Sequence, residues 1–239
     1  MTKYLSLALL LIAFNAHAEV VIKPGDPALR ADLIKESHDF YRNVTTDSSG
    51  KILYDFMMES TTSIDVAAQR ITFSRFRQIP FGSYSIDVSV TDLSLRPISM
   101  RDDRPQRASS CVMQFQDTEV IVKTTRKGVE ATKRYAMTKG YFEDNSIGYI
   151  LGYLDLKPGV KYVLDNFNKD TAAPSDPYTI EYAFDDVWEL AADHRMECTV
   201  FHFTHGDATG HVWIEKATHQ KVKTIGVTKN GTRFVVTKQ

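Results

Sequence analysis

The chain has 239 residues, of which 29 are basic and 30 are acidic, so its formal net charge at neutral pH is -1. This balance excludes the basic surface that nucleic-acid binding requires, and it provides no attraction to anionic lipid. We therefore expect no nucleic-acid partner, and membrane contact that is at most peripheral. Hydrophobic residues make up 43% of the chain and aromatic residues 11%, which is enough to bury the core of a globular domain.

Residues 1–18 have the pattern of a cleavable secretion signal. Lys3 supplies a short positive segment, and the apolar run Leu5–Phe14 follows it. The motif Ala16-His17-Ala18 then provides the small residues at the positions where signal peptidase cleaves. The apolar run is too short to cross a bilayer, which takes roughly 20 residues. The sequence therefore predicts release into the periplasm and a single β-rich domain over residues 19–239.

The first part of that domain has a helical pattern. Asp26 is a suitable N-cap, and Pro27 occupies the first helical position. Residues at spacings of three and four then form one stripe along about four helical turns: Leu29, Leu33, Ile34, Ser37, Phe40, Tyr41 and Val44. We predict an amphipathic helix that ends before Thr45–Gly50.

After Gly50 the apolar period changes from about 3.6 to 2, which is typical of strands. Runs of β-branched and aromatic residues recur between short turns: Ile52–Met58, Ile64–Phe73, Tyr84–Thr91, Cys111–Phe115, Glu119–Thr124, Lys161–Phe167, Tyr178–Phe184, Cys198–Phe203, His211–Ile214, Val222–Val227 and Phe234–Thr237. Strands this closely spaced favour an antiparallel meander that curls into an open or half-barrel. The predicted strands do not alternate with helices, so we do not expect a parallel sheet.

One short helix interrupts the strands. Asp144 is a suitable N-cap, and four apolar residues then fall on one helical face: Ile147, Ile150, Leu151 and Leu154. Lys157-Pro158-Gly159 ends this helix. The expected fold is mainly β, of the α+β class, with the N-terminal helix and this short helix covering the concave face of the sheet.

The two cysteines, Cys111 and Cys198, both lie in predicted strands. In an oxidising compartment an even number of cysteines favours a disulfide. A bridge that closes so long a loop would stabilise the fold by about 4 kcal/mol in the chain-entropy model. The alternative is a pair of buried thiols that pack as small hydrophobic side chains.

Three motifs resemble those of a family of exported bacterial β-proteins that is known only as a domain of unknown function. Val90–Pro97 resembles its strand followed by x-x-Leu-x-Pro, and Phe142–Gly159 resembles its short helix followed by Leu-x-Leu-x-x-Gly. Val212–Val222 resembles its closing pair of strands. The resemblance covers about residues 84–239. It implies a fold like the open barrels of the periplasmic lipoprotein carriers, in which helices plug an apolar concave face, and it implies no catalytic residues.

Three histidines, His202, His205 and His211, lie within ten residues of each other. If the flanking strands pair symmetrically about Ala208, His205 faces His211 across the turn. These two imidazoles and Asp207 are candidate zinc ligands, although a catalytic zinc normally has three protein ligands in a fixed shell. The alternative is a solvated turn that carries polar side chains.

Other signals of catalysis are weak. The sequence has no Gly-x-Ser-x-Gly elbow, and adjacent carboxylates such as Asp102-Asp103 and Asp185-Asp186 point to opposite faces of a strand. The basic stretch Lys123–Lys127 fits the outward charges of a hairpin. An anionic head group could contact Arg70, Arg75 and Arg77, but phenylalanines interleave with these arginines as on an ordinary amphipathic strand. We expect no cofactor, and we favour a protein that is not an enzyme.

The sequence favours a periplasmic protein that binds an apolar ligand, such as an acyl chain or lipid, or a partner in the cell envelope. The ligand groove would lie where the helices cover the curved sheet incompletely, bordered by Phe40, Ile147, Leu151 and Leu154. One alternative is a small metal-dependent or hydrolytic enzyme that uses the His202–His211 hairpin. Another is a structural partner-binding module with a filled core.

Overall fold

A single large sheet dominates the computed structural model, which describes residues 18–79, 83–137, 140–168, 171, 173–191 and 194–239. The strands are β1 (Ala18–Ile22), β2 (Ser37–Thr46), β3 (Ile52–Asp65), β4 (Arg70–Ile79), β5 (Ser83–Asp92), β6 (Pro97–Arg104), β7 (Ser109–Phe115), β8 (Glu119–Arg126), β9 (Val129–Ala136), β10 (Phe142–Glu143), β11 (Val160–Asn168), β12 (Ala173–Ala191), β13 (His194–His205), β14 (Ala208–Glu215), β15 (Lys221–Thr228) and β16 (Arg233–Lys238). The helical elements are α1 (Asp144–Ile150) and the 3-10 turns η1 (Ala31–Leu33), η2 (Pro105–Arg107) and η3 (Leu151–Tyr153).

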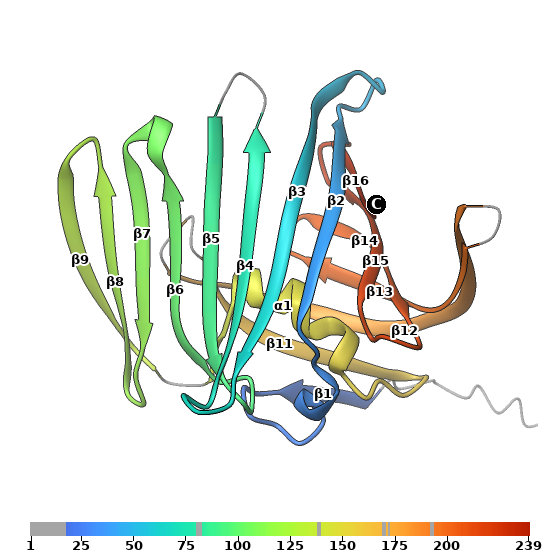
Figure 1. Ribbon diagram of the computed structural model, residues 1–239, viewed down its shortest axis with the longest axis horizontal. Coiled ribbons are helices and arrows are strands. Elements are labelled where there is room, and N and C mark those ends of the chain that lie inside the picture. Colours follow the sequence, from blue (N-terminus) through green and yellow to red (C-terminus); the bar gives the residue numbers. More distant parts are fainter. Residues whose placement is uncertain (1–17, 80–82, 138–139, 169–170, 172, 192–193) are drawn as a thin grey trace, which may run out of the picture.

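The strand order is β1-β11-β12-β13-β14-β15-β16-β2-β3-β4-β5-β6-β7-β8-β9, and β10 pairs with β11 beside this path. Most neighbours are antiparallel, whereas β1 and β10 run parallel to β11. In Figure 1, β2 to β9 form one wall and the strands from β11 onward curve away from it, with α1 between them. The order ends at β1 and β9 without closing, so the predicted mainly-β open barrel is confirmed.

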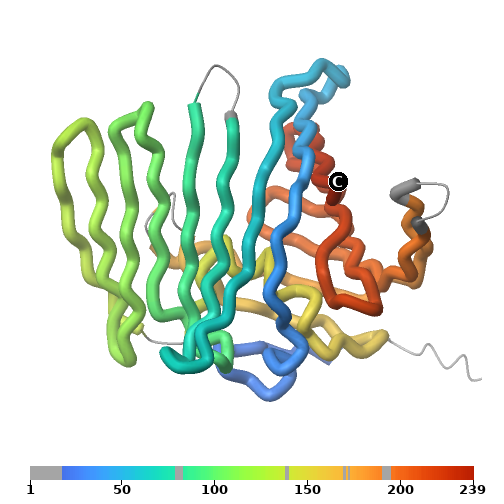
Figure 2. Tube along the Cα trace, in the orientation of Figure 1, coloured from blue at the N-terminus to red at the C-terminus, as the bar shows by residue number. Residues whose placement is uncertain are grey.

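Most predicted strands are present, with altered boundaries. The run Ile64–Phe73 spans the turn between β3 and β4 rather than one strand. The prediction did not include β6 and β9, and Figure 2 shows β9 at one side of the wall. The predicted secretion signal lies outside the described residues except for Ala18, which begins β1. In the described part of the chain, no helix is long and apolar enough to cross a membrane.

The predicted N-terminal helix is wrong. Residues 31–33 form the 3-10 turn η1, and Ser37–Thr46 form β2, which pairs with β3 on one side and β16 on the other. Hydrogen bonding to two partners outweighs the helical spacing of the apolar residues, since sheet context overrides local propensity. Phe40 and Tyr41 consequently lie on opposite faces, and only Tyr41 is buried.

The short helix is confirmed as α1 followed by η3. Its N-cap is Glu143 rather than Asp144, because the Glu143 carboxylate accepts hydrogen bonds from the backbone N–H groups of Asn145 and Ser146. Leu29 and Ile34, from the segment before β2, still contribute to the core beside this helix. The covering role expected of the N-terminal segment is therefore met by irregular chain and a 3-10 turn.

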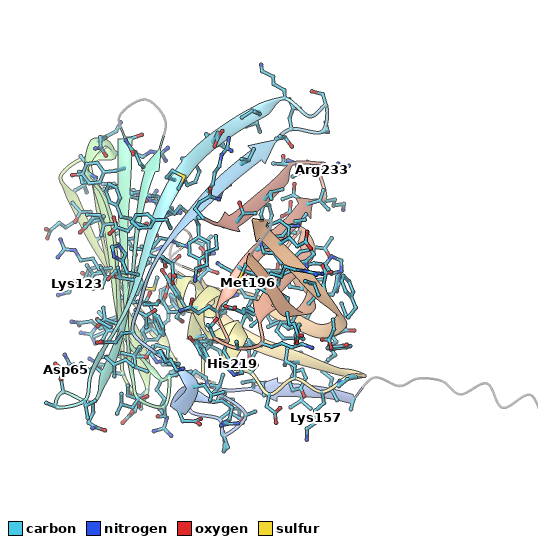
Figure 3. All side chains as sticks on the ribbon, turned by 45° about the vertical axis from the view of Figure 1, so that its right-hand side comes forward. Asp65, Lys123, Lys157, Met196, His219 and Arg233 are labelled. Carbon is cyan, nitrogen blue, oxygen red and sulfur yellow. The ribbon has the colours of Figure 1, made fainter. Side chains whose placement is uncertain are left out.

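The main hydrophobic core lies where α1 and η3 contact the inner sides of the two walls. Its most buried members come from both walls and the helix: Ile71, Phe73, Phe142, Ile147, Ile150, Leu164, Ile180 and Phe201. Figure 3 shows side chains occupying the space between the walls, with Asp65 and Lys123 on the wall of β2 to β9 and Met196, His219 and Arg233 on the other side. A second cluster lies under β6 to β8 and contains Met100, Met113, Val120, Val122 and Phe167.

The structure holds Cys111 and Cys198 as buried thiols. Cys111 lies on β7 in the cluster under β6 to β8, whereas Cys198 lies on β13 in a cluster with Val200 and Trp213. Many strands separate β7 from β13 in the sheet order. The predicted disulfide is therefore not formed, and both residues pack as small hydrophobic side chains.

The residues predicted to border one groove differ sharply in burial, and this difference can be tested. Leu151 is 5% exposed and Phe40 is 46% exposed. We expect Leu151→Ala to lower the free energy of unfolding by about 2–5 kcal/mol through lost contacts and a cavity. Phe40→Ala should change it by no more than about 0.5 kcal/mol. Urea unfolding measures both values, and equal losses would contradict this placement.

Candidate functional site

The inner face of β5 is polar, which reverses the usual alternation of a half-buried strand. Four polar residues of this strand are almost fully buried: Ser85, Asp87, Ser89 and Thr91. Ile86, between two of them, is 37% exposed on the outer face. The described residues therefore place a polar surface, not an apolar groove, on this part of the concave face.

Asp87 is the centre of an ion-pair network on that surface. Its Oδ2 atom lies 3.0 Å from Nη2 of Arg75 and 2.7 Å from Nη2 of Arg77, both on β4. Asp87 is 2% exposed, so its charge is compensated inside the protein rather than by water. Two donors on one carboxylate supply the hydrogen bonding that a buried charge needs.

The same network fixes the first turn of α1. Asn145 Oδ1 accepts a hydrogen bond of 2.5 Å from Nη2 of Arg75. Because the carbonyl oxygen of this amide is committed to the guanidinium, the orientation of the side chain is determined. The Asn145 Nδ2 group is buried without a hydrogen-bond partner among the residues that the structure describes, and Asn145 is 8% exposed.

Glu143 holds α1 against β5. Its carboxylate accepts hydrogen bonds from the N–H groups of Asn145 at 2.8 Å and Ser146 at 3.0 Å. The Ser89 hydroxyl donates to the same carboxylate at 2.5 Å. Burial raises the pKa of Glu143 to about 7, although these hydrogen bonds act in the opposite direction.

A small pocket of about 50 Å³ lies between β2 to β4 on one side and α1 with β15 on the other. Arg75, Asn145 and Lys221 line it, together with several aromatic or apolar side chains: Tyr41, Met58, Phe73, Tyr149 and Tyr153. Tyr149 stacks on Phe73 with ring centroids 4.8 Å apart. A space of this size admits a few water molecules or one small polar group.

Lys221 enters the pocket because β15 has a bulge. Lys223 pairs with Trp213, but Lys221 pairs with Ile214, so one extra residue lies on β15 between the two pairs. A bulge changes the face on which the following side chains lie, and Lys221 consequently points to the inner face. The hydroxyl of Tyr41 donates to the Lys221 carbonyl at 2.9 Å and ties β15 to β2.

The Lys221 ammonium lies beside α1. A Cβ atom at Gly148 would be 3.8 Å from Nζ, and Gly148 is one helical turn after Asn145. No hydrogen bond or ion pair joins this ammonium to the described residues, and the side chain is reached by solvent only in part. Burial, followed by the charge of Arg75, lowers the pKa of Lys221 to about 8.

The other charges around the pocket are compensated. Arg75 is paired with Asp87, and Asp39, which also lines the pocket, lies 2.7 Å from Nζ of Lys238. Among the described residues, the Lys221 ammonium lies over the Tyr41 ring, 5.4 Å from its centroid, but it has no hydrogen-bond acceptor and no counter-ion. The Asn145 amide group has no acceptor there either. The arrangement suits a ligand that accepts hydrogen bonds and carries negative charge.

The residues predicted to border an apolar groove do not form one. Phe40 lies on the outer face of β2, whereas Ile147, Leu151 and Leu154 are buried members of the main core. Their apolar surfaces contact the sheet directly. The sequence pattern had identified the core-facing side of α1, while the polar side of the same helix lines the pocket.

The predicted histidine pair differs from the observed register. His202 pairs with His211, and His205 pairs with Ala208, so His205 lies on the opposite face from His211. His205 stacks on Tyr178 with ring centroids 3.8 Å apart, and its Nε2 accepts a hydrogen bond from Asn166. Burial lowers the pKa of His205. Asp207 lies in the turn, and the described residues contain no group of three or more potential metal ligands.

The pocket was not identified from the sequence, although Arg75 had been considered as a contact for an anionic head group. The Ser85–Thr91 alternation shows that β5 has a polar face, but not that this face is the inner one. A period of two places Lys221 and Lys223 on the same face, and only the bulge separates them. Of the predicted carboxylate pairs, Asp102 is buried on the inner face next to Asp87, and Asp103 pairs with Arg101 outside.

Glu143 should make stability depend on pH. Its folded pKa of about 7 lies above the ordinary value of 4.5, so the folded state binds this proton more tightly than the unfolded state. The stability contributed by this group is complete below about pH 4.5 and is lost as the pH rises to about 7, by about 3 kcal/mol. We expect Glu143→Gln to remove this loss, as measured by urea unfolding across that range. Glu130→Gln, at an exposed site, should keep the wild-type pH profile, and parallel profiles for all three proteins would contradict the assignment.

Comparison with known proteins bears on the fold. The β-barrel-like protein of the domain of unknown function DUF1849 from Brucella abortus superposes with a TM-score of 0.55 at 8% sequence identity, over 85% of this chain and 95% of that one. A DUF1329 family protein from Desulfovibrio piger matches over 91% of this chain and 92% of that one at 10% identity, with a TM-score of 0.30. No curated protein matches the sequence.

The family described as "Protein of unknown function (DUF3108)" matches residues 42–237. This match confirms the resemblance to a β-rich family of unknown function that the motifs of the second half of the chain indicated. Because the match extends over most of the length, from β2 to β16, the chain belongs to the DUF3108 family.

Proposed function

We propose that this protein is a non-enzymatic binding protein of the cell envelope that holds the carboxylate group of a small organic ligand in the pocket between β4, α1 and β15. The observation that carries the proposal is a pair of donors with no hydrogen-bond acceptor among the described residues, the Lys221 ammonium and Asn145 Nδ2, on the walls of the same small pocket.

A buried donor without a partner costs about 1–3 kcal/mol, and more when it is charged. A carboxylate has two oxygen atoms and can accept from both donors, and its charge would offset that of Lys221. Charge-assisted hydrogen bonds of this type are about twice as strong as neutral ones. The pocket is therefore better matched to a carboxylate than to an alcohol or an amide.

The aromatic lining favours an organic ligand over a simple ion. Tyr41, Tyr149 and Tyr153 surround the donors, and Phe73 and Met58 extend the apolar part of the wall. Binding sites commonly combine such apolar walls with a few placed polar groups. The acyl-chain ligand expected from the sequence is replaced by a smaller ligand, because the core-facing side of α1 is already packed against the sheet.

Acetate is a suitable probe, because it is small enough for a pocket that admits one small polar group. We expect it to bind saturably in calorimetry and to shift the Asn145 side-chain amide signals in NMR spectra. Lys221→Met should weaken binding about tenfold or more, since it removes a charge-assisted contact. The affinity should also fall as the pH rises above about 8, approaching about tenfold per pH unit, because the amine loses its charge.

Two controls make this test specific. Lys123→Met removes the same charge from an exposed position on β8 and should leave acetate binding unchanged. Acetamide has nearly the same size without the charge and should bind much more weakly than acetate. Equal binding of acetate by wild type and Lys221→Met, or equal binding of acetamide and acetate by wild type, would refute the proposed carboxylate site.

Export is part of the proposal and has a separate test. It is supported by the signal pattern of residues 1–18, and cleavage after Ala18 would leave Glu19–Ile22 paired with β11. We expect intact-mass measurement of a periplasmic extract to find a chain that begins at Glu19. A chain that retains Met1–Ala18 and sediments with membranes would contradict export with cleavage.

A further inference from the structure

A row of arginines and serines crosses the inner face of the wall formed by β4 to β8. In the strand register, Arg77 lies opposite Ser85, Arg104 lies opposite Ser109, and Ser109 lies opposite Arg126. Ile86 lies opposite Asp103, so the preceding residue of β5, Ser85, is aligned with the following residue of β6, Arg104. We call these five residues the arginine row. Its arginines lie on alternate strands, about 10 Å apart along the sheet.

The row has more positive charge than its surroundings compensate. The neighbouring inner row contains Arg75 and two buried carboxylates, Asp87 and Asp102. Asp87 is shared by Arg75 and Arg77, and Asp102 lies 2.7 Å from Nη2 of Arg104. Four arginines thus face two carboxylates, and within the described chain no ion pair involves Arg126. An anion bound along the row would balance this excess.

Two adjacent polar groups in the row have no hydrogen-bond partner in the described part of the chain. Arg77 Nε and Ser85 Oγ are both buried, and Ser85 is 1% exposed. Burial, followed by the charge of Arg75, lowers the pKa of Arg77, although Asp87 and Asp102 act in the opposite direction. Buried polar groups in folded proteins almost always have a partner, so the donors at this end of the row are incompletely satisfied.

A hollow lies at the other end of the row. Its volume is about 260 Å³, and Arg104, Ser109 and Arg126 line it together with Asp102, Cys111 and Thr124. The guanidinium groups, serine hydroxyls and open space therefore occur on one surface. This surface shares no residue with the carboxylate pocket, so a test of ligand binding here is independent of the proposed function.

We propose that the arginine row binds a phosphate-type oxyanion in the hollow lined by Arg104, Ser109 and Arg126, either inorganic phosphate or the phosphoryl group of a larger molecule. A tetrahedral oxyanion has more acceptor oxygens than a carboxylate and can accept from two guanidinium groups and a serine hydroxyl together. A phosphate monoester carries a charge of about -1.5 to -2 at neutral pH, which matches the excess of two arginines.

The test uses the purified protein and inorganic phosphate, titrated by calorimetry and NMR at constant ionic strength with chloride as the background anion. We expect saturable binding that shifts resonances of Arg104, Ser109 and Arg126. Arg126→Gln should weaken this binding about tenfold, because it removes one charge-assisted contact. Arg101→Gln, which removes the same charge from the outer face of β6, should leave the dissociation constant within about twofold of wild type.

Ser109→Ala separates binding from folding. Ser109 is half-buried, and its hydroxyl makes no hydrogen bond within the described part of the chain, so the variant should be as stable as wild type. The same change should weaken phosphate binding severalfold, because this hydroxyl lines the hollow. A Ser109→Ala variant that loses stability without losing phosphate affinity would assign the hydroxyl a structural role and overturn the proposal.

A second titration distinguishes the two sources of the phosphate group. Monomeric dihexanoyl phosphatidic acid that binds more tightly than inorganic phosphate identifies a lipid head group, and equal affinities identify free phosphate. In both cases Arg126→Gln must weaken binding and Arg101→Gln must not. The absence of saturable binding of either compound, or equal losses in the two arginine variants, refutes the site.

Discussion

The Asp87 carboxylate is the contact on which the inner surface of the barrel depends. It is almost completely buried, and it neutralises Arg75 and Arg77 on the adjacent strand. Without it, two guanidinium groups would face each other inside the protein, and breaking a buried pair of this kind typically costs about 3–5 kcal/mol. A hydrophobic isostere of the whole network could be equally stable. We therefore infer that the charged network serves to orient the arginine side chains rather than to stabilise the fold.

The Asp87 network positions side chains at both candidate sites. Arg75, held by Asp87, takes the Asn145 carbonyl and leaves the amide N–H₂ free to bind a ligand. Glu143 places Asn145 at the start of α1 by accepting from its backbone. On the other side of Asp87, Arg77 begins the arginine row. One carboxylate thus separates a pocket with a single ammonium from a surface with several guanidinium groups, and the two sites need not compete for the same charge.

The sequence predicted the class of this fold because the strand signals are local. The alternation in the second half of the chain and the apolar face of α1 both survive in the structure, since each segment buries the residues that its own period marks. The N-terminal segment was misassigned because β2 gains its structure from β3 and β16, which no local pattern reveals. Propensity yields to hydrogen bonding with distant partners in such cases.

The site was harder to predict than the fold, for two physical reasons. On β5 the polar residues face inward, and an alternating pattern specifies two faces without stating which one is buried. At Lys221 and across the His205–His211 turn, a shift of one residue in register transfers a side chain to the other face. Buried ion pairs form between residues on different strands, so the chemistry of this protein appears only when the register is known.

The pairing of β2 with β16 has a consequence for how the protein folds. A chain that emerges from its N-terminus exposes β2 long before Arg233–Lys238 is available. Until then β2 is an open edge, and open edges can pair with other chains. Contacts between such distant segments also slow folding, because the chain loses the entropy of loop closure before the contact can stabilise it. Productive folding of this barrel therefore depends on keeping an early strand unpaired until the last strand of the chain arrives.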